Sequence, residues 1–304
     1  MRLVRTIAEV RAALAEPRRA DEQIGLVPTM GAFHEGHLSL MRQARAQCDH
    51  VVVSLFVNPS QFNESSDLSA YPRDEACDAA LAAEEGVDLL FAPTVEELYP
   101  AGFATTVSVA GLTDELEGVH RGRAHFAGVA TIVTKLLNIV APHVAYFGQK
   151  DAQQALVIKR FVHDLDIPTR IEICPTVREP DGLAMSSRNA RLDAEQRGRA
   201  TALYRALRSA EAAVAAGERD PAAVQARARA ELDGASVEPE YLELVSAQTL
   251  APVTAIDGEV LAVLAARVGN TRLIDNHLIA KNGRRHDAAD DAQVEDPPGD
   301  RDRL

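Results

Sequence analysis

Short apolar runs alternate with helical segments between Ile24 and Cys174, and this alternation constrains the fold more than any other feature of the sequence. Val51–Val57 is apolar apart from Ser54, and an alanine-rich helical segment beginning near Arg73 separates it from Val87–Phe91. Runs this short and continuous are typical of strands buried on both faces. We therefore predict an α/β fold with a Rossmann-like parallel sheet and helices on both faces. The expected strands are 24–27, 51–57, 87–91, 144–147 and 169–174, and the expected helices are 37–48, a segment from about 73, 127–140 and 150–165.

The character of the sequence changes after Thr176. Two alanine-rich segments have helical spacing, and two apolar runs are typical of strands. We predict a Rossmann-like domain over residues 1–176 and a smaller C-terminal α+β domain over 177–283. The stretch 284–304 holds seven acidic and four basic residues and almost no large apolar side chain, so we expect a disordered tail that cannot offset its ordering entropy by burial. The expected helices of the second domain are 194–216 and 221–232, and its expected strands are 241–245 and 260–266.

Composition excludes several classes of protein. With 45 acidic and 32 basic residues the chain has a formal net charge of −13, which repels a phosphate backbone and argues against nucleic acid as a partner. The three cysteines, Cys48, Cys77 and Cys174, form no CxxC pair, which favours neither a disulfide framework nor a thiolate zinc site. No signal peptide or membrane span is recognisable. We expect a cytoplasmic protein that acts in solution, with no membrane partner.

The segment Pro28–His37 carries the most chemical information. It follows the first expected strand and opens the first expected helix, the position where parallel α/β sheets bind ligands and where a helix N-terminus attracts anions. Gly31 and Gly36 allow close approach of the backbone, and His34 and His37 can donate hydrogen bonds to phosphate oxygens. The pattern indicates a phosphate site. A zinc site with a third ligand elsewhere, ordinary helix capping and a chance pair of histidines stay open as alternatives.

Two further segments fit the same chemistry. Phe147–Asp151 again joins a strand to a helix, where Lys150 can supply a point charge to phosphate and Asp151 can cap the helix, orient the lysine or help hold magnesium. Met185–Asn189 places two hydroxyls and a guanidinium in a loop, where they can close over a polyphosphate. Each segment alone is also consistent with plain capping or an ordinary surface loop, so their weight comes from occurring together.

Taken together, the HEGH tetrapeptide 34–37 and the MSSR loop 185–188 resemble the signature pair of the HIGH-motif nucleotidyltransferase superfamily. Within that superfamily, longer strings resemble the pantothenate synthetase (pantoate–β-alanine ligase) family over about residues 1–280. These strings are PTMGAFHEGH (28–37), SLFVNPSQF (54–62), YPR (71–73), HFAGVATIVTKLLNIV (125–140), FGQKDAQQ (147–154), PTVREPDGLAMSSRN (175–189) and TRLIDN (271–276).

The resemblance implies a ligase that condenses pantoate with β-alanine using ATP, through a pantoyl adenylate, with Mg²⁺ and as a homodimer. It implies catalytic roles for His34, His37, Lys150, Ser186, Ser187 and Arg188, with His37 as the proton donor. These side chains suit the chemistry, because cations and N–H donors around the α-phosphate stabilise the charge that develops there. The ATP site implied by the resemblance comprises Met30, Gly31, Ala32, Phe33, His34, Glu35, Gly36, His37, Gly148, Gln149, Lys150, Asp151, Val177, Met185, Ser186, Ser187 and Arg188.

The resemblance also implies that Gln61 and Gln154 bind pantoate, a task that suits amides because they donate or accept without adding charge. Tyr71, Asp74 and Asp78 fall near the substrate mouth and magnesium region of the family, but the local sequence does not align, and metal ligands stay unassigned. Because the MSSR loop lies at the domain junction, we expect the second domain to close over ATP.

Three other functions stay open at this point. Another transferase of the superfamily would keep the histidines and the serine loop but would not need Gln61 or the FGQKDAQQ string. A tRNA synthetase fragment would need a basic surface, which the net charge opposes. A regulatory nucleotide-binding module would be favoured by a missing histidine or lysine, and both types are present.

Overall fold

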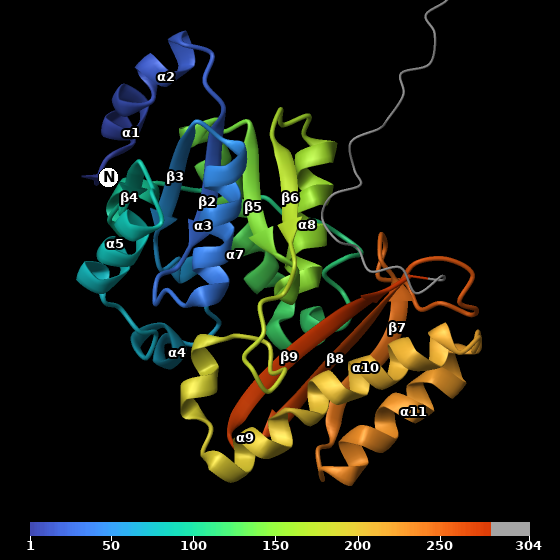
Figure 1. Ribbon diagram of the computed structural model, residues 1–304. Coiled ribbons are helices and arrows are strands. Elements are labelled where there is room, and N and C mark those ends of the chain that lie inside the picture. The colour runs from blue at the N-terminus through green and yellow to red at the C-terminus, as the bar shows by residue number, and fades with distance from the viewer. Residues whose placement is uncertain (281–304) are drawn as a thin grey trace, which may run out of the picture.

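The computed structural model describes residues 1–280, and the expected tail 284–304 lies outside the described residues. The larger part of the chain is a six-stranded sheet in the order β1-β4-β3-β2-β5-β6, in which every neighbouring pair is parallel. The prediction of a Rossmann-like parallel sheet is confirmed (Figure 1). The strands are β1 (Arg2–Val4), β2 (Ile24–Thr29), β3 (His50–Leu55), β4 (Leu89–Phe91), β5 (Val144–Gly148) and β6 (Arg170–Cys174).

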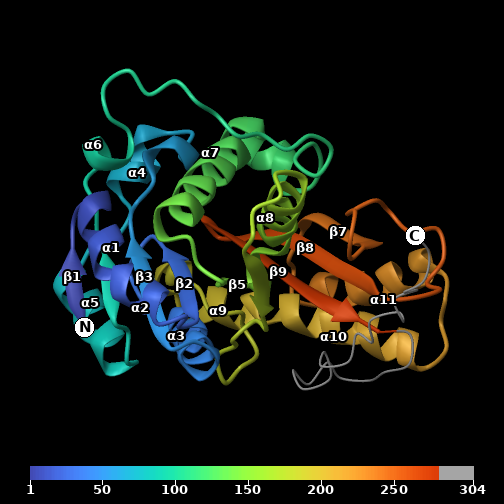
Figure 2. The same cartoon turned by 90° about the horizontal axis from the view of Figure 1, so that it is seen from above.

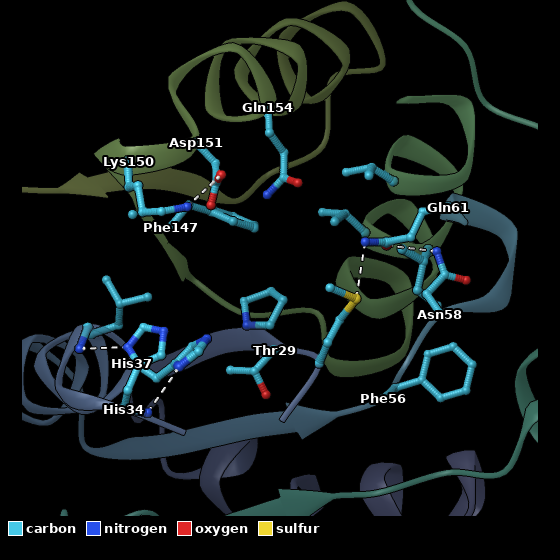
Figure 3. A pocket seen from close by; sticks show the side chains of 18 of the residues that line it. Thr29, His34, His37, Phe56, Asn58, Gln61, Phe147, Lys150, Asp151 and Gln154 are labelled. Carbon is cyan, nitrogen blue, oxygen red and sulfur yellow. Dashed lines mark hydrogen bonds and ion pairs between the residues drawn. The ribbon is translucent and has the colours of Figure 1, made fainter. Parts of the chain in front are cut away.

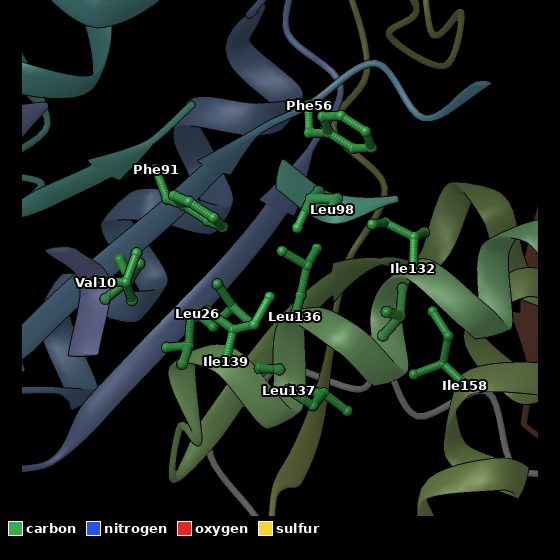
Figure 4. Close-up of a cluster of buried hydrophobic side chains, with 14 of the residues drawn as sticks. Val10, Leu26, Phe56, Phe91, Leu98, Ile132, Leu136, Leu137, Ile139 and Ile158 are labelled. Atoms are coloured by element: carbon green, nitrogen blue, oxygen red, sulfur yellow. The ribbon is translucent and has the colours of Figure 1, made fainter. Parts of the chain in front are cut away.

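Helices cover both faces of this sheet. Figure 2 shows α7 and α8 on one side and α3 on the other. One core cluster lies between the sheet and helices α1, α7 and α8, and it includes Leu26, Phe91, Leu136 and Ile158 (Figure 4). The opposite cluster packs α3 and α5 on the sheet. The helices of this part are α1 (Ile7–Ala13), α2 (Ala15–Arg19), α3 (Glu35–Gln47), α4 (Ser65–Ser69), α5 (Glu75–Glu84), α6 (Val95–Leu98), α7 (Glu117–Val140) and α8 (Ala152–Asp164), with short 3₁₀ turns η1 (Pro59–Gln61) and η2 (Gln149–Asp151).

The C-terminal part is a three-stranded antiparallel sheet with helices on one face, as expected of a smaller α+β unit. Its other face packs on the N-terminal part, where Val245, Leu261 and Val263 share a cluster with Phe126 of α7 and Val157 of α8. The sheet is therefore covered on both sides. Its elements are η3 (Ser187–Arg191), α9 (Ala194–Ala200), α10 (Ala202–Ala215), α11 (Pro221–Gly234), β7 (Pro239–Ser246), β8 (Val260–Val268) and β9 (Thr271–Ile279).

Several boundaries differ from the sequence-based prediction. α7 begins about ten residues before the expected start, across a kink at Gly122, whose φ of 77° is not helical. The helix expected over 194–216 is divided at Thr201. Two strands were not expected: β1 has three residues, of which only Val4 is buried, and β9 interrupts its apolar residues with Arg272 and other polar side chains. Within residues 1–280 no helix is both long and apolar enough to cross a membrane.

Candidate active site

Two adjoining cavities open at the carboxyl ends of β2 and β5, which are neighbouring strands of the sheet. The chain leaves β2 toward β3 on one side and leaves β5 toward β6 on the other, so the crevice between the strand ends is a topological switch point. Ligands of open α/β sheets bind at such points. Figure 3 shows side chains from the loops after β2, β3 and β5 converging on the first cavity.

The loop after β2 turns sharply before α3. Gly31 and Ala32 both have positive φ values, 87° and 54°, so consecutive amide groups point to the same side. The buried Asp78 carboxylate on α5 accepts hydrogen bonds from the N–H of Ala32 (2.9 Å) and of Phe33 (2.8 Å). A Cβ on residue 31 would come within 2.8 Å of an Asp78 oxygen, which explains the glycine. Asp78 therefore holds the turn that leads into the two histidines.

His34 and His37 stand side by side at the start of α3, with ring centroids 4.2 Å apart. The Nδ1 atom of His34 accepts from the Gly36 amide (3.1 Å), and the Nδ1 atom of His37 lies 3.4 Å from the His34 amide. With Nδ1 an acceptor, each neutral ring carries its proton on Nε2. Burial, and then the positive charge of His34 and Lys150, lowers the pKa of His37 to about 3. Burial likewise lowers the pKa of His34, followed by the charge of Lys150. Both rings are therefore neutral hydrogen-bond donors near pH 7.

Lys150 faces the histidines from the end of β5. Its ammonium lies 3.3 Å from the Asp151 carboxylate, and both residues line the two cavities (Figure 3). The lysine side chain is 19% exposed, against 49% for the aspartate, so the cation is the more enclosed partner. The site thus has two neutral N–H donors opposite one largely enclosed positive charge.

The MSSR loop covers the second cavity. Ser186 caps η3 by accepting from the Arg188 amide (3.3 Å), and Ser186, Ser187 and Arg188 all line the cavity. The Arg188 guanidinium has no hydrogen-bond or ion-pair partner within residues 1–280. Burial, and then repulsion by Arg121, lowers its pKa. An unpaired, enclosed guanidinium is suited to binding an anion.

An amide pair lies at the opposite side of the first cavity. Asn58 donates to the side-chain oxygen of Gln61 (3.0 Å), and the Gln61 amide nitrogen lies 3.1 Å from the Met30 sulfur. Gly128 allows η1 to rest directly on α7, because a Cβ there would come within 2.3 Å of the Ser60 carbonyl oxygen. Gln154, one turn into α8, points into the same cavity and has no side-chain partner among the described residues (Figure 3).

Most residues expected at the site line one of these cavities. For five of the expected ATP-site residues the structure gives no lining position: Gly31, Ala32, Phe33, Glu35 and Gln149. The backbone of 31–33 is turned toward Asp78, the Glu35 side chain pairs with Arg42, and the Gln149 amide donates to Asn276 of β9 (3.1 Å). These residues lie next to the site in the chain, but their polar groups bond to neighbouring protein groups.

Sequence reasoning missed several residues of the site. Asn58 falls within a string that was recognised, yet only its burial and its contact with Gln61 reveal its role. His125 donates from Nδ1 to the Gln61 carbonyl (2.6 Å), and Thr176 has a buried hydroxyl with no partner among the described residues. Arg121 lines the second cavity although the sequence around it gave no signal. The α7 side chains Val129, Ile132, Val133 and Leu136 form an apolar wall.

The zinc alternative finds no support in residues 1–280. No group of three or more histidine, cysteine, aspartate or glutamate side chains is placed there to hold a metal ion. A structural or catalytic zinc needs at least three protein ligands, and the His34–His37 pair has no third among the described residues. The hydrogen bond from the Gly36 amide to His34 shows that helix capping does occur here.

The parallel order of the sheet and the cavities at its switch point define a doubly wound α/β protein with a candidate ligand site at the carboxyl ends of its strands. The chain belongs to the pantoate-beta-alanine ligase family, whose model matches residues 2–278. It is 54% identical to a pantothenate synthetase of Cereibacter sphaeroides over 275 residues, which are 90% of this chain and 98% of the relative.

Solved structures agree with this assignment. The crystal structure of a pantothenate synthetase from Thermus thermophilus is 47% identical, with a TM-score of 0.86 over 91% of this chain and 99% of that one. A pantoate-beta-alanine ligase from Francisella tularensis, complexed with beta-gamma ATP and beta-alanine, is 34% identical, with a TM-score of 0.75 over 91% of this chain and 97% of that one. The chain is therefore an enzyme of the ligase class with the fold of these relatives.

Proposed function

We propose that this enzyme condenses pantoate with β-alanine, using ATP, to give pantothenate, AMP and pyrophosphate through a pantoyl-adenylate intermediate. The main support for this proposal is that two adjoining cavities with different linings share a wall. One combines an apolar surface with amides, and the other gathers cations and hydroxyls. A branched hydroxy acid and a triphosphate are the two ligands that such a pair of environments suits.

ATP would lie across the end of β5, with its phosphates between the histidines and the MSSR loop. Lys150 and Arg188 supply positive charge, Ser186 and Ser187 supply hydroxyl donors, and the neutral His34 and His37 supply Nε2–H donors. Met30, Gly36, Gly148, Val177 and Met185 line the cavities nearby. Thr176, whose hydroxyl lacks a partner among residues 1–280, is an additional donor for the nucleotide.

Pantoate would occupy the pocket beneath α7. Its two methyl groups match the wall of Val129, Ile132 and Val133, because apolar groups gain most from water exclusion. Gln61 and Gln154 would bind its hydroxyl and carboxylate oxygens. The Gln61 amide is held for this task by Asn58, whose own side-chain oxygen accepts from the Tyr99 hydroxyl (2.8 Å).

In the first step a pantoate carboxylate oxygen attacks the α-phosphorus, a P–O bond forms, and the P–O bond to pyrophosphate breaks. Negative charge moves onto the α-phosphoryl and bridging oxygens, where fixed donors stabilise it without reorganisation. The pKa of about 3 makes His37 a hydrogen-bond donor in this step, since a neutral imidazole gives up its proton poorly. In the second step the β-alanine amine attacks the acyl carbon, the C–O bond to AMP breaks, and the amine loses a proton.

Magnesium would be brought to the site with ATP. In phosphoryl-transfer sites Mg²⁺ is held by one or two carboxylates together with substrate phosphates, and it neutralises their charge. Asp151 is the carboxylate suited to this purpose, because it lines both cavities and is half exposed. The two other acids that line the second cavity within residues 1–280 are already paired, Glu117 with two arginines and Asp275 with Arg178.

We also propose that residues 1–176 and 177–283 act as two domains, with the second closing over ATP by way of the MSSR loop. Closure would exclude water from the adenylate, which water would otherwise hydrolyse. The apolar cluster shared by the two parts favours a small movement that leaves the second sheet against α7 and α8. Family membership further supports a cytoplasmic location and a homodimer, and the mass of the protein in solution would test the dimer.

The decisive experiment is pyrophosphate–ATP exchange on purified protein with magnesium. We expect exchange that requires pantoate and does not require β-alanine, because the adenylate forms before the amine reacts. Folded protein that binds ATP but shows no exchange in the presence of pantoate would contradict the proposal. Exchange with another carboxylic acid would assign a different acid to the apolar pocket, and no exchange with any would favour a regulatory nucleotide-binding module.

A further inference from the structure

Arg121 lies on the α7 segment just before the kink at Gly122, and it faces the second cavity. A small side cavity next to it is lined by four cations: Arg121, Lys150, Arg188 and Arg272. The one acid among the described residues that lines this side cavity, Asp275, is bonded at both oxygens by Arg178 (2.7 and 3.0 Å). Positive charge is therefore concentrated at this end of the site.

Glu117 fixes the direction of Arg121. Its carboxylate is 8% exposed and accepts from the Arg121 Nε atom (2.8 Å), from both terminal nitrogens of Arg272 (2.7 and 2.9 Å) and from the Tyr241 hydroxyl (2.9 Å). Arg272 has a second acid, Glu240, at 2.6 Å. The Glu117 carboxylate therefore pairs with two arginines, and of these two Arg272 alone has a second acidic partner among the described residues.

The remaining donors of Arg121 are free to bind a ligand. Its two terminal nitrogens have no hydrogen-bond partner among residues 1–280, since the guanidinium bonds Glu117 through Nε alone. The neighbouring Arg188 guanidinium is likewise unpaired within the described chain. Two such guanidinium groups facing one cavity repel each other, and that repulsion is relieved when a multivalent anion lies between them.

We propose that Arg121 binds the terminal phosphates of ATP, donating from its two terminal nitrogens opposite Arg188, and then holds pyrophosphate as it leaves. This inference rests on the proposed function, because it identifies the anion as the part of ATP that the first step releases. Glu117 acts as a positioning residue: it fixes the guanidinium through Nε and leaves the terminal nitrogens without a partner among residues 1–280.

The test compares the affinities of MgATP and AMP for three variants by calorimetry. Arg121→Gln removes the charge, Arg121→Lys keeps the charge without the forked donors, and Arg123→Gln is a control on the same segment, because Arg123 is 78% exposed and paired with Asp114. We expect Arg121→Gln to weaken MgATP binding about tenfold or more while changing AMP binding less than about twofold, as loss of a charged contact typically does. Arg121→Lys should fall between, and Arg123→Gln should match the unchanged protein.

Three results would overturn the inference. Equal losses for MgATP and AMP would mean that Arg121 only supports the fold, and unchanged MgATP binding would mean that it touches no phosphate. A variant changed only in its KM for β-alanine would assign Arg121 to the amino acid. If the unchanged enzyme shows no pantoate-dependent exchange, yet Arg121→Gln selectively weakens MgATP, the assignment of Arg121 stands and the assignment of the acid fails.

Discussion

Replacement of Asp78 by asparagine tests whether the turn before α3 is held by a buried carboxylate. Each Asp78 oxygen accepts one amide, from Ala32 at 2.9 Å and from Phe33 at 2.8 Å. Asparagine keeps one acceptor oxygen but turns an NH₂ group toward the second amide. Since a hydrogen bond to a charged group contributes about 1.5–3 kcal/mol and a buried unpaired donor costs about 1–3 kcal/mol, we expect a loss of about 2–4 kcal/mol in the free energy of unfolding.

This loss should also reach the active site. At about 2–4 °C per kcal/mol for a protein of this size, the melting temperature should fall by roughly 4–16 °C. The same turn carries His34 and His37, and misplacement of a catalytic group by about 1 Å typically costs about 10²-fold in rate. We therefore expect kcat for pyrophosphate–ATP exchange to fall by one to two orders of magnitude at a temperature where the variant is fully folded.

Two companion variants separate the positioning role from a loss of charge. Asp74→Asn removes an acid one turn earlier, where asparagine caps α5 as well as aspartate does, and it should leave the free energy of unfolding unchanged. Gly31→Ala should reproduce the loss, because its Cβ would come within 2.7 Å of Leu55 and 2.8 Å of Asp78 at a φ of 87°. An Asp78→Asn enzyme with normal melting and normal kcat would refute the reasoning.

Three further predictions concern His37 and the MSSR loop. The His37 ring should stay neutral between about pH 5 and 8, because burial holds its pKa at about 3. The NMR resonance of His37 is identified as the one that is lost in His37→Gln, and it should not titrate in that range. A titration midpoint near 6.5 would contradict the burial of this ring. Because the unfolded chain protonates this histidine near pH 6.5 and the folded protein does not, the free energy of unfolding should fall as pH drops below about 6.5. Saturating MgATP should slow hydrogen exchange in residues 181–189 and in the C-terminal unit, and unchanged exchange there would argue against closure over ATP.

The strand and helix alternation was predictable because buried parallel strands are continuously apolar. Val51–Val57 and Val144–Phe147 were recognised from that property alone; β5 contains all of the second run, and β3 contains the first run as far as Leu55. β9 was not predicted, because the polar residues that interrupt its apolar pattern make contacts that exist only in the folded chain. Arg272 bonds Glu117 of α7, and Asn276 bonds the backbone carbonyl groups of Gln149 and Lys150 (both 2.9 Å).

The residues suited to phosphate chemistry could likewise be selected from sequence, because histidines, a lysine and a serine–arginine loop occur together after expected strands. The protonation states and hydrogen-bond partners of these residues could not be predicted from the sequence. The low pKa of His37 depends on burial and on the nearby charges of His34 and Lys150, and Lys150 lies far away in the chain. The use of the Ala32 and Phe33 amides by Asp78, rather than by a ligand, also depends on how α5 packs beside the turn.

The sequence by itself determined the fold class, the family and most of the polar groups of the site, since periodicity and local motifs are properties of neighbouring residues. Only the tertiary structure decided which donors remain free. Arg121 and Arg123 are two positions apart and chemically alike, yet one faces the cavity with terminal nitrogens unpaired within residues 1–280 and the other is exposed. The difference arises from Glu117, which is buried against β7 and β9 and so fixes one arginine and not the other.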